Sequence, residues 1–207
     1  MKAEFLRSVY AIGDLPQPGA PEIAVAGKSN VGKSSLINRL VQRRQLAKTS
    51  RTPGKTRCLN YYQIIPDTRS SFMLVDLPGY GYAKVSHNMR DDWAKLIDTY
   101  LAQPDRPAGL ITLFDARREP AEGDLDWLAW LAEWQRPVLV VLTKCDKLSN
   151  NEKSASLRRW TTKDHPSEMP PQPSSAETGV GVPQIWQWID RTRKITTSKG
   201  KQGALAP

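Results

Sequence analysis

The sequence has few of the features that mark secreted or membrane-spanning proteins. Its 207 residues include only two cysteines, Cys58 and Cys145, which are too few for a disulfide framework and fit free thiols in a reducing cytoplasm. No apolar run is long enough to cross a bilayer, and the first residues lack the apolar core of a signal peptide. Lys2 stands where N-myristoylation requires glycine, and the last residues form no prenylation box. We therefore expect a cytoplasmic protein without a membrane partner.

Acidic residues are also scarce, with 21 Asp and Glu against 30 Lys and Arg and a formal net charge of +9. This balance favours polyanionic partners such as RNA, although a merely basic, soluble surface explains it equally well. The hydrophobic content of 39% and the charged content of 25% are typical of a globular domain with a real core. We expect one folded domain over residues 1–190 and a basic, disordered tail over residues 191–207, which contains no acid.

Apolar runs alternate with helical patterns along the chain. This alternation predicts an α/β protein of three layers, in which helices cover both faces of a mainly parallel six-stranded sheet. Right-handed crossovers bring the carboxyl ends of parallel strands to one edge, where ligands bind. Residues 5–10 could add a strand at the sheet edge. The expected strands cover residues 23–26, 58–65, 72–75, 110–114 and 138–142, with a short, irregular one in the proline-rich segment 165–173; the expected helices begin at residue 35 and cover 88–101, 124–134, 151–160 and the region of 185–189.

A glycine-rich segment follows the first of these central strands. Gly27–Ser34 reads GKSNVGKS and fits the phosphate-loop pattern G-x-x-x-x-G-K-[ST] between a strand and a helix. Its glycines let the backbone approach phosphate oxygens, and successive N–H groups face the anion together with the helix N-terminus. We expect Lys33 to bridge the β- and γ-phosphates and the Ser34 hydroxyl to hold Mg²⁺. The segment predicts nucleotide binding.

The base is indicated by Thr143–Asp146, which reads TKCD after a strongly apolar strand. The Asp146 carboxylate can accept hydrogen bonds from both N1–H and the 2-amino group of guanine, a donor pair that adenine lacks. The Lys144 stem can lie over the purine, and backbone N–H groups near Ser175 and Ala176 could meet guanine O6. These features favour GTP over ATP.

Two further segments predict a magnesium site and a switch. Asp76 ends a strand beside the phosphate loop and is expected to hold Mg²⁺ through water, while the Gly79 N–H meets the γ-phosphate. Thr56 lies in a polar, basic loop and would add its hydroxyl to Mg²⁺ only when the γ-phosphate is present, as in the order–disorder switch of GTPases. Thr49 and Thr52 compete with Thr56 for this role.

Together these segments resemble the bacterial EngB (YihA/YsxC) GTP-binding proteins over roughly residues 4–190. The resemblance is carried by Gly27–Ser35, Thr52–Thr56 (TPGKT), Asp76–Ala83 (DLPGYGYA) and Thr143–Asp146. It implies assembly of the large ribosomal subunit, with precursor rRNA and ribosomal proteins as partners, a linked role in cell division and septation, and Thr56 as the Mg²⁺ threonine. No stable homo-oligomer is expected. The proline-rich segment 165–173 departs from the family pattern, which leaves the residues of the Ser174–Ala176 motif open.

Hydrolysis is expected to be slow. Many GTPases carry a glutamine after D-x-x-G to orient the attacking water, but Tyr80 stands there, so a rate on the order of 10⁻⁴–10⁻³ s⁻¹ is expected without an activating factor. The catalytic candidates are Lys33, Asn30 and Gly79. Asn30 is either a ligand of a stimulating K⁺ ion or a residue that only caps a turn.

Two other classes of protein carry phosphate loops. A metabolic phosphotransferase would need an acceptor pocket and a lid, which no segment supplies, and a membrane-linked division GTPase is disfavoured by the missing lipid motifs. The expected ligands are GTP or GDP and Mg²⁺, with K⁺ as a further candidate. The residues expected at the nucleotide are Gly27, Lys28, Ser29, Asn30, Val31, Gly32, Lys33, Ser34, Ser35, Gly54, Lys55, Thr56, Asp76, Leu77, Pro78, Gly79, Thr143, Lys144, Cys145, Asp146, Ser174, Ser175 and Ala176.

Overall fold

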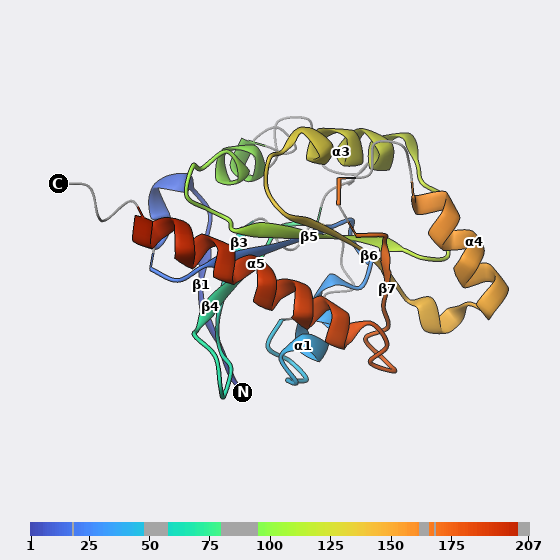
Figure 1. Ribbon diagram of the computed structural model, residues 1–207, viewed down its shortest axis with the longest axis horizontal. Coiled ribbons are helices and arrows are strands. Elements are labelled where there is room, and N and C mark those ends of the chain that lie inside the picture. The colour runs from blue at the N-terminus through green and yellow to red at the C-terminus, as the bar shows by residue number, and fades with distance from the viewer. Residues whose placement is uncertain (18, 48–57, 80–94, 162–165, 168, 203–207) are drawn as a thin grey trace.

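The computed structural model describes residues 1–17, 19–47, 58–79, 95–161, 166–167 and 169–202, with side chains as far as residue 194. One seven-stranded sheet runs through this part of the chain in the order β1-β3-β4-β2-β5-β6-β7 (Figure 1). The strands are β1 (Lys2–Val9), β2 (Glu22–Gly27), β3 (Leu59–Ile65), β4 (Phe72–Asp76), β5 (Gly109–Asp115), β6 (Val138–Thr143) and β7 (Gln172–Pro173). The β1/β3 and β3/β4 pairs are antiparallel, and the other pairs are parallel.

The expected α/β architecture is confirmed, but the sheet has seven strands where the sequence predicted six. The additional strand is β1, which lies at the sheet edge where residues 5–10 were considered as a further strand, and it pairs with β3 from Lys2↔Ile65 to Val9↔Leu59. A register shift between Phe5 and Arg7 interrupts this pairing. As a result, the two buried apolar side chains of β1 enter different clusters, Ala3 in one and Val9 in the other, so the strand is anchored to both faces of the sheet.

Helices cover both faces of the sheet. They are α1 (Lys33–Leu40), a helical segment at 95–101, α3 (Glu122–Glu133), α4 (Asn150–Trp160) and α5 (Val182–Gln202). On one face, α1 and α5 bury Leu36, Ile37 and Ile185 against side chains that include Ile23 and Val25 of β2. On the other face, Tyr100 and Leu131 pack in a cluster with Ala24 and Ala26. The alternation of large and small residues along β2 therefore serves two helical layers, which Figure 1 shows on opposite sides of the sheet.

The proline-rich segment forms the other edge of the sheet, as a strand of only two residues. Gln172 and Pro173 pair with Val141 and Leu142 of β6. Proline has no N–H to donate to a further strand, so it is tolerated at this edge. The short, irregular strand predicted within residues 165–173 is confirmed.

The prediction of a disordered tail from Arg191 is wrong for the residues that the structure describes. Helix α5 continues to Gln202, and a domain boundary at residue 190 would fall inside it. Tertiary contacts hold the helix past this point: Arg193 is 3% exposed, binds Asp190 at 3.0 Å and the Ser70 carbonyl, and lies 5.5 Å from the centre of the Phe72 ring. Residues 203–207 lie outside the described residues.

Candidate functional site at the carboxyl edge of the sheet

The phosphate loop is a tight turn between β2 and α1. Asn30 and Gly32 adopt left-handed backbone conformations, with φ of 60° and 108°, and the Val31 N–H donates to the Lys28 carbonyl at 3.2 Å. Gly32 precedes Lys33, the first residue of α1, and no side chain that the structure describes caps this helix start. The first N–H groups of α1 are thus directed into the turn, where the helix dipole favours an anion.

Lys33 and Asp76 bring opposite charges together at this turn. Asp76 ends β4, which lies next to β2 in register Val25↔Asp76, and its carboxylate is ion-paired with the Lys33 ammonium. Both side chains are largely buried, with exposed fractions of 10% for Lys33 and 5% for Asp76. Ser34, the next residue of α1, completes a set of one amine, one carboxylate and one hydroxyl.

This set fits Mg²⁺ held between protein and phosphate. Among the described residues, no group of three or more His, Cys, Asp or Glu side chains could form an all-protein metal cage. Mg²⁺ needs no such cage, because it is usually held by one or two protein ligands together with phosphates and water. When bound, the ion neutralises charge on the phosphates. Ser34 and Asp76 are the described residues that would hold it.

The segment after β4 lies against the phosphate loop. The Leu77 N–H donates to the Val25 carbonyl at 2.9 Å. A Cβ atom added to Gly79 would lie 2.9 Å from the Ser29 hydroxyl and 3.2 Å from the Ser29 nitrogen, so only glycine allows this approach. Gly79 thus lies against the phosphate loop, on the side where the sequence analysis expected its N–H to meet the γ-phosphate. The candidates Gly54, Lys55 and Thr56, the competing Thr49 and Thr52, and Tyr80 lie outside the described residues.

The predicted base-binding segment is bonded directly to the phosphate loop. Thr143 ends β6, and its hydroxyl donates to the Val31 carbonyl at 2.6 Å. Lys144 has a left-handed backbone conformation with φ of 60°, and its ammonium donates to the Asn30 carbonyl at 2.7 Å. Two successive residues at the end of β6 therefore fix the far side of the loop. This arrangement fixes the phosphate loop relative to the segment that contains Asp146.

Asp146 is held as a carboxylate. A hydrogen bond from Ser175 and the Lys147 ammonium at 3.2 Å lower the pKa of Asp146 below its ordinary value of 3.8. An ionised carboxylate accepts hydrogen bonds only, so it suits the two adjacent donors of guanine. A backbone hydrogen bond also joins the two segments, because the Cys145 N–H donates to the Ser174 carbonyl at 3.2 Å, one residue before Asp146 and Ser175 respectively.

The turn after β7 corrects one expectation. The Ser175 N–H donates to the Val180 carbonyl at 3.0 Å, so it is committed within the turn and does not face guanine O6. The Ser175 hydroxyl accepts from the N–H groups of Glu177 and Thr178 at 3.2 and 3.1 Å. Of the two N–H groups proposed for O6, this leaves Ala176. Ser174 is fully buried, and its N–H donates to the Leu142 carbonyl of β6 at 2.8 Å, so it joins the turn to the sheet.

The sequence analysis did not identify Asp115, which ends β5 at the same edge. Its carboxylate binds the Lys144 ammonium at 2.9 Å and the Arg117 guanidinium at 2.9 and 2.7 Å. Burial alone would raise the pKa of Asp115, but the hydrogen bonds from Arg117 and Lys144 more than offset it and hold the pKa well below the ordinary range. The position of Asp115 after an apolar strand, like that of Asp76, was the available signal.

A second unpredicted pair joins the phosphate loop to α3. The Lys28 ammonium lies 2.7 Å from a carboxylate oxygen of Asp124, whose side chain is 7% exposed. Asp124 also accepts the Ala121 N–H at 3.1 Å, which closes the first turn of α3. Loop residues and α3 line a cavity of about 150 Å³, with Trp160 and Asp115 among its walls. The loop is therefore fixed on two sides, by Lys144 and by Asp124.

Comparison with known proteins agrees with this geometry. Residues 22–144 match the family described as "50S ribosome-binding GTPase". The "Probable GTP-binding protein EngB" of Geobacter sp. (strain M21) is 41% identical over 196 residues, which cover 95% of this chain and 90% of the relative. The protein of the same name from Syntrophomonas wolfei is 46% identical over 187 residues, which cover 89% of this chain and 93% of the relative.

Solved structures share the fold. A crystal structure of a probable GTP-binding protein engB has a TM-score of 0.65 at 20% identity and covers 84% of this chain and 98% of its own. The structure of Era in complex with MgGDPNP and 16S ribosomal RNA has a TM-score of 0.68 at 24% identity, over 82% of this chain and 55% of its own. No helix in the described part of the chain is long and apolar enough to span a membrane. By its similarity to the curated relatives, the chain belongs to the EngB family of GTP-binding proteins, which are phosphate-loop GTPases.

Proposed function

We propose that this GTPase is a switch in assembly of the large ribosomal subunit, acts in the cytoplasm, and through ribosome supply supports normal cell division and septation. The observation that carries the proposal is the match of residues 22–144 to a family described as binding the 50S ribosome. The net charge of +9 supports a partner rich in RNA phosphate. The partners are precursor rRNA and ribosomal proteins of the large subunit, and the chain acts as a monomer.

The slow hydrolysis that we propose follows from the residue after Gly79. Tyr80 replaces the glutamine that orients water in many GTPases, and a phenol cannot both accept from and donate to that water as an amide does. Turnover without a partner on the order of 10⁻⁴–10⁻³ s⁻¹ suits a timer that releases its partner after hydrolysis.

The roles of the site residues are part of the same proposal. Lys33 binds the β- and γ-phosphates, and Gly79 meets the γ-phosphate. The Ser34 hydroxyl holds Mg²⁺, and Asp76 holds it through water. Asp146 reads guanine, with support from Lys144 and the Ala176 N–H. Asn30 contributes to a K⁺ site, although its left-handed conformation equally suits an asparagine that only shapes the turn.

The test is nucleotide-dependent sedimentation with large-subunit particles. We expect the wild-type chain to sediment with these particles in a non-hydrolysable GTP analogue and to leave them in GDP. Asp146→Asn should lose this response to guanine nucleotides and regain it with the xanthine analogue, because the amide donates to the carbonyl of xanthine. If wild type and Asp146→Asn both sediment with the particles to the same extent whichever nucleotide is present, the proposed switch is refuted.

A further inference from the structure

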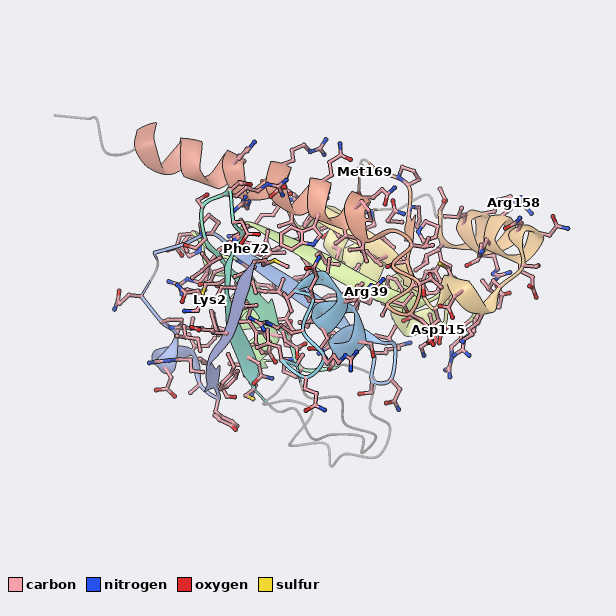
Figure 2. All side chains as sticks on the ribbon, turned by 90° about the horizontal axis from the view of Figure 1, so that it is seen from below. Lys2, Arg39, Phe72, Asp115, Arg158 and Met169 are labelled. Carbon is pink, nitrogen blue, oxygen red and sulfur yellow. The ribbon has the colours of Figure 1, made fainter. Side chains whose placement is uncertain are left out.

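A groove of about 850 Å³ opens between α5 and the turn that joins β3 to β4. Its floor is fixed by Trp186, which donates its indole N–H to the Leu40 carbonyl at 3.1 Å and packs edge-on against Phe72, with ring centres 5.9 Å apart. The groove is lined by Arg69 from the turn and by Pro183, Trp186, Gln187, Asp190, Arg191 and Lys194 from α5. Figure 2 shows Phe72 beneath this helix.

The groove is separate from the nucleotide site. The β3–β4 turn precedes Phe72, and the next residue, Met73, pairs with Glu22 at the start of β2. The phosphate loop instead leaves the other end of β2, at Gly27. The groove follows α5 from Pro183 to Lys194, and its lining residues include none of those expected at the nucleotide. A ligand in the groove can therefore be bound together with GTP.

Charge is distributed unequally between the two helical layers. On the groove side, α1 carries Lys33 and Arg39 and no acid, and α5 as far as residue 194 carries one acid against three bases: Asp190 against Arg191, Arg193 and Lys194. On the opposite face, α3 carries four acids and no base: Glu122, Asp124, Asp126 and Glu133. Helix α4 packs in the same layer through Trp160 and carries one acid against three bases, so the two helices together remain net negative. Positive charge thus exceeds negative charge on the α1/α5 face, which predicts a polyanion there and not on the α3 face.

Within the groove, the single acid is already neutralised. The Asp190 carboxylate is ion-paired with Arg69 on one side and with Arg193 at 3.0 Å on the other. Arg193 is buried under the helix, whereas Arg191 and Lys194 are exposed along the groove wall. The wall therefore presents a net positive charge that is organised by fixed ion pairs.

We propose that this groove binds the phosphodiester backbone of RNA. Guanidinium and ammonium groups on a concave wall match phosphate oxygens, and arginine does so with two parallel hydrogen bonds. An RNA backbone is favoured over a lipid surface because none of the exposed large apolar side chains among the described residues lies on α5; they are Phe5, Leu6, Tyr10, Ile65, Leu125, Trp130 and Val180. The proposal rests on the proposed ribosomal role, and it assigns one RNA-binding surface to this face.

The experiment compares two charge-matched double variants of the full chain, each bound to a non-hydrolysable GTP analogue. Arg191→Gln with Lys194→Gln alters the groove, and Lys153→Gln with Arg158→Gln removes the same charge from α4, which Figure 2 shows at the far end of the molecule. Binding of a fluorescein-labelled RNA hairpin is followed by anisotropy over about 50–300 mM KCl. The slope of log K against log [KCl] should become shallower by about 0.7–0.9 for each RNA phosphate that the variant no longer neutralises, so affinity in 100 mM KCl should fall about tenfold or more for the groove variant. The α4 variant should stay within about twofold of wild type.

Several results would overturn the assignment. Equal decreases in affinity in the two double variants would mean that net charge acts without a specific site. The assignment would also be refuted if the wild-type chain did not bind the hairpin, or if it bound phosphatidylserine vesicles through Arg191 and Lys194 in preference to RNA. The affinity for a fluorescent GDP should be the same in all proteins, which shows that the variants are folded. If wild type and groove variant sediment equally with large-subunit particles, the groove assignment fails while the proposed function stands; if wild type does not sediment with them, the proposed function fails.

Discussion

The contact between Asp115 and Lys144 should control how tightly the protein binds nucleotide. The Lys144 ammonium joins the Asp115 carboxylate at 2.9 Å and the Asn30 carbonyl at 2.7 Å, so it connects three strand ends of the sheet through one cation. Asp115→Asn keeps the size of the side chain but removes its charge. A hydrogen bond to a charged group is worth about 1.5–3 kcal/mol, and the partial exposure of Lys144 moves the expected effect to the lower part of that range.

A decrease of about 1.4 kcal/mol in binding free energy corresponds to a tenfold change in affinity, so we expect Asp115→Asn to raise Kd for both GDP and GTP about tenfold. The rate at which bound GTP is hydrolysed in a single turnover should change by less than about twofold, because the residues proposed to bind the phosphates and Mg²⁺, Lys33 and Asp76, are ion-paired with each other and not with Asp115. Stopped-flow measurement with a fluorescent GDP should show the change mainly as faster dissociation.

Two controls separate this link from general damage. Arg117→Gln also removes a partner of Asp115. The Arg117 side chain is 44% exposed, and in the described contacts its guanidinium donates to Asp115 and not to the phosphate loop. The Kd of this variant for GDP should therefore stay within about twofold of wild type. In a double-mutant cycle with Lys144→Met, the Asp115→Asn effect should largely disappear, with a coupling of about 1 kcal/mol. Additive effects of the two substitutions, or an unchanged Kd for Asp115→Asn, would refute the link.

Three further predictions follow from other residues of the site. If Asn30 contributes to a K⁺ site, wild-type GTP turnover should be faster in KCl than in NaCl at equal ionic strength and Asn30→Ala should abolish the difference; equal wild-type rates would remove the cation role. Asp124→Asn should weaken nucleotide binding severalfold by loosening Lys28, whereas Asp126→Asn on the same helix should not, and equal effects would point to the helix and not to the loop. The pKa of Asp115 is held below its ordinary 3.8, so the ionised carboxylate stabilises the fold above that value and this contribution is lost as the pH falls. The free energy of unfolding should therefore decrease more steeply below about pH 5 in wild type than in Asp115→Asn. Parallel curves of unfolding free energy against pH for the two proteins would contradict this.

The sequence was sufficient to predict the fold class and the main segments of the site because both depend on local patterns. Gly27–Ser34, Asp76–Gly79 and Thr143–Asp146 each follow an apolar strand, and the carboxyl ends of parallel strands share one edge of a sheet. The structure places these segments together as that rule requires. The count of six strands was too low because β1 has a register shift and buries only single residues on each face, which weakens its alternation in the sequence.

Contacts between distant residues could not be predicted in the same way. Lys28 and Asp124 are ordinary charged residues in their own segments, and only the packing of α3 beside the phosphate loop brings them to 2.7 Å. The commitment of the Ser175 N–H to Val180 depends on a turn with two glycines at positive φ, Gly179 and Gly181, whose geometry the sequence did not specify. Asp115 is different: it ends a strand at the ligand edge as Asp76 does, so the rule that found Asp76 also applies to it.

The error about residues 191–202 has a physical origin that bears on the groove. A prediction from composition alone assumes that every basic side chain is solvated, so a segment with several bases and no acid is predicted to be disordered. In the folded chain, Arg193 is instead buried between Asp190, the Ser70 carbonyl and the Phe72 ring, so it acts as a tertiary anchor. The anchor ties α5 to the β3–β4 turn and leaves its neighbours Arg191 and Lys194 at the surface. Within this basic segment, Arg193 therefore anchors the helix to the rest of the fold, whereas Arg191 and Lys194 expose their charges at its surface. This difference follows from the helix geometry and not from the composition.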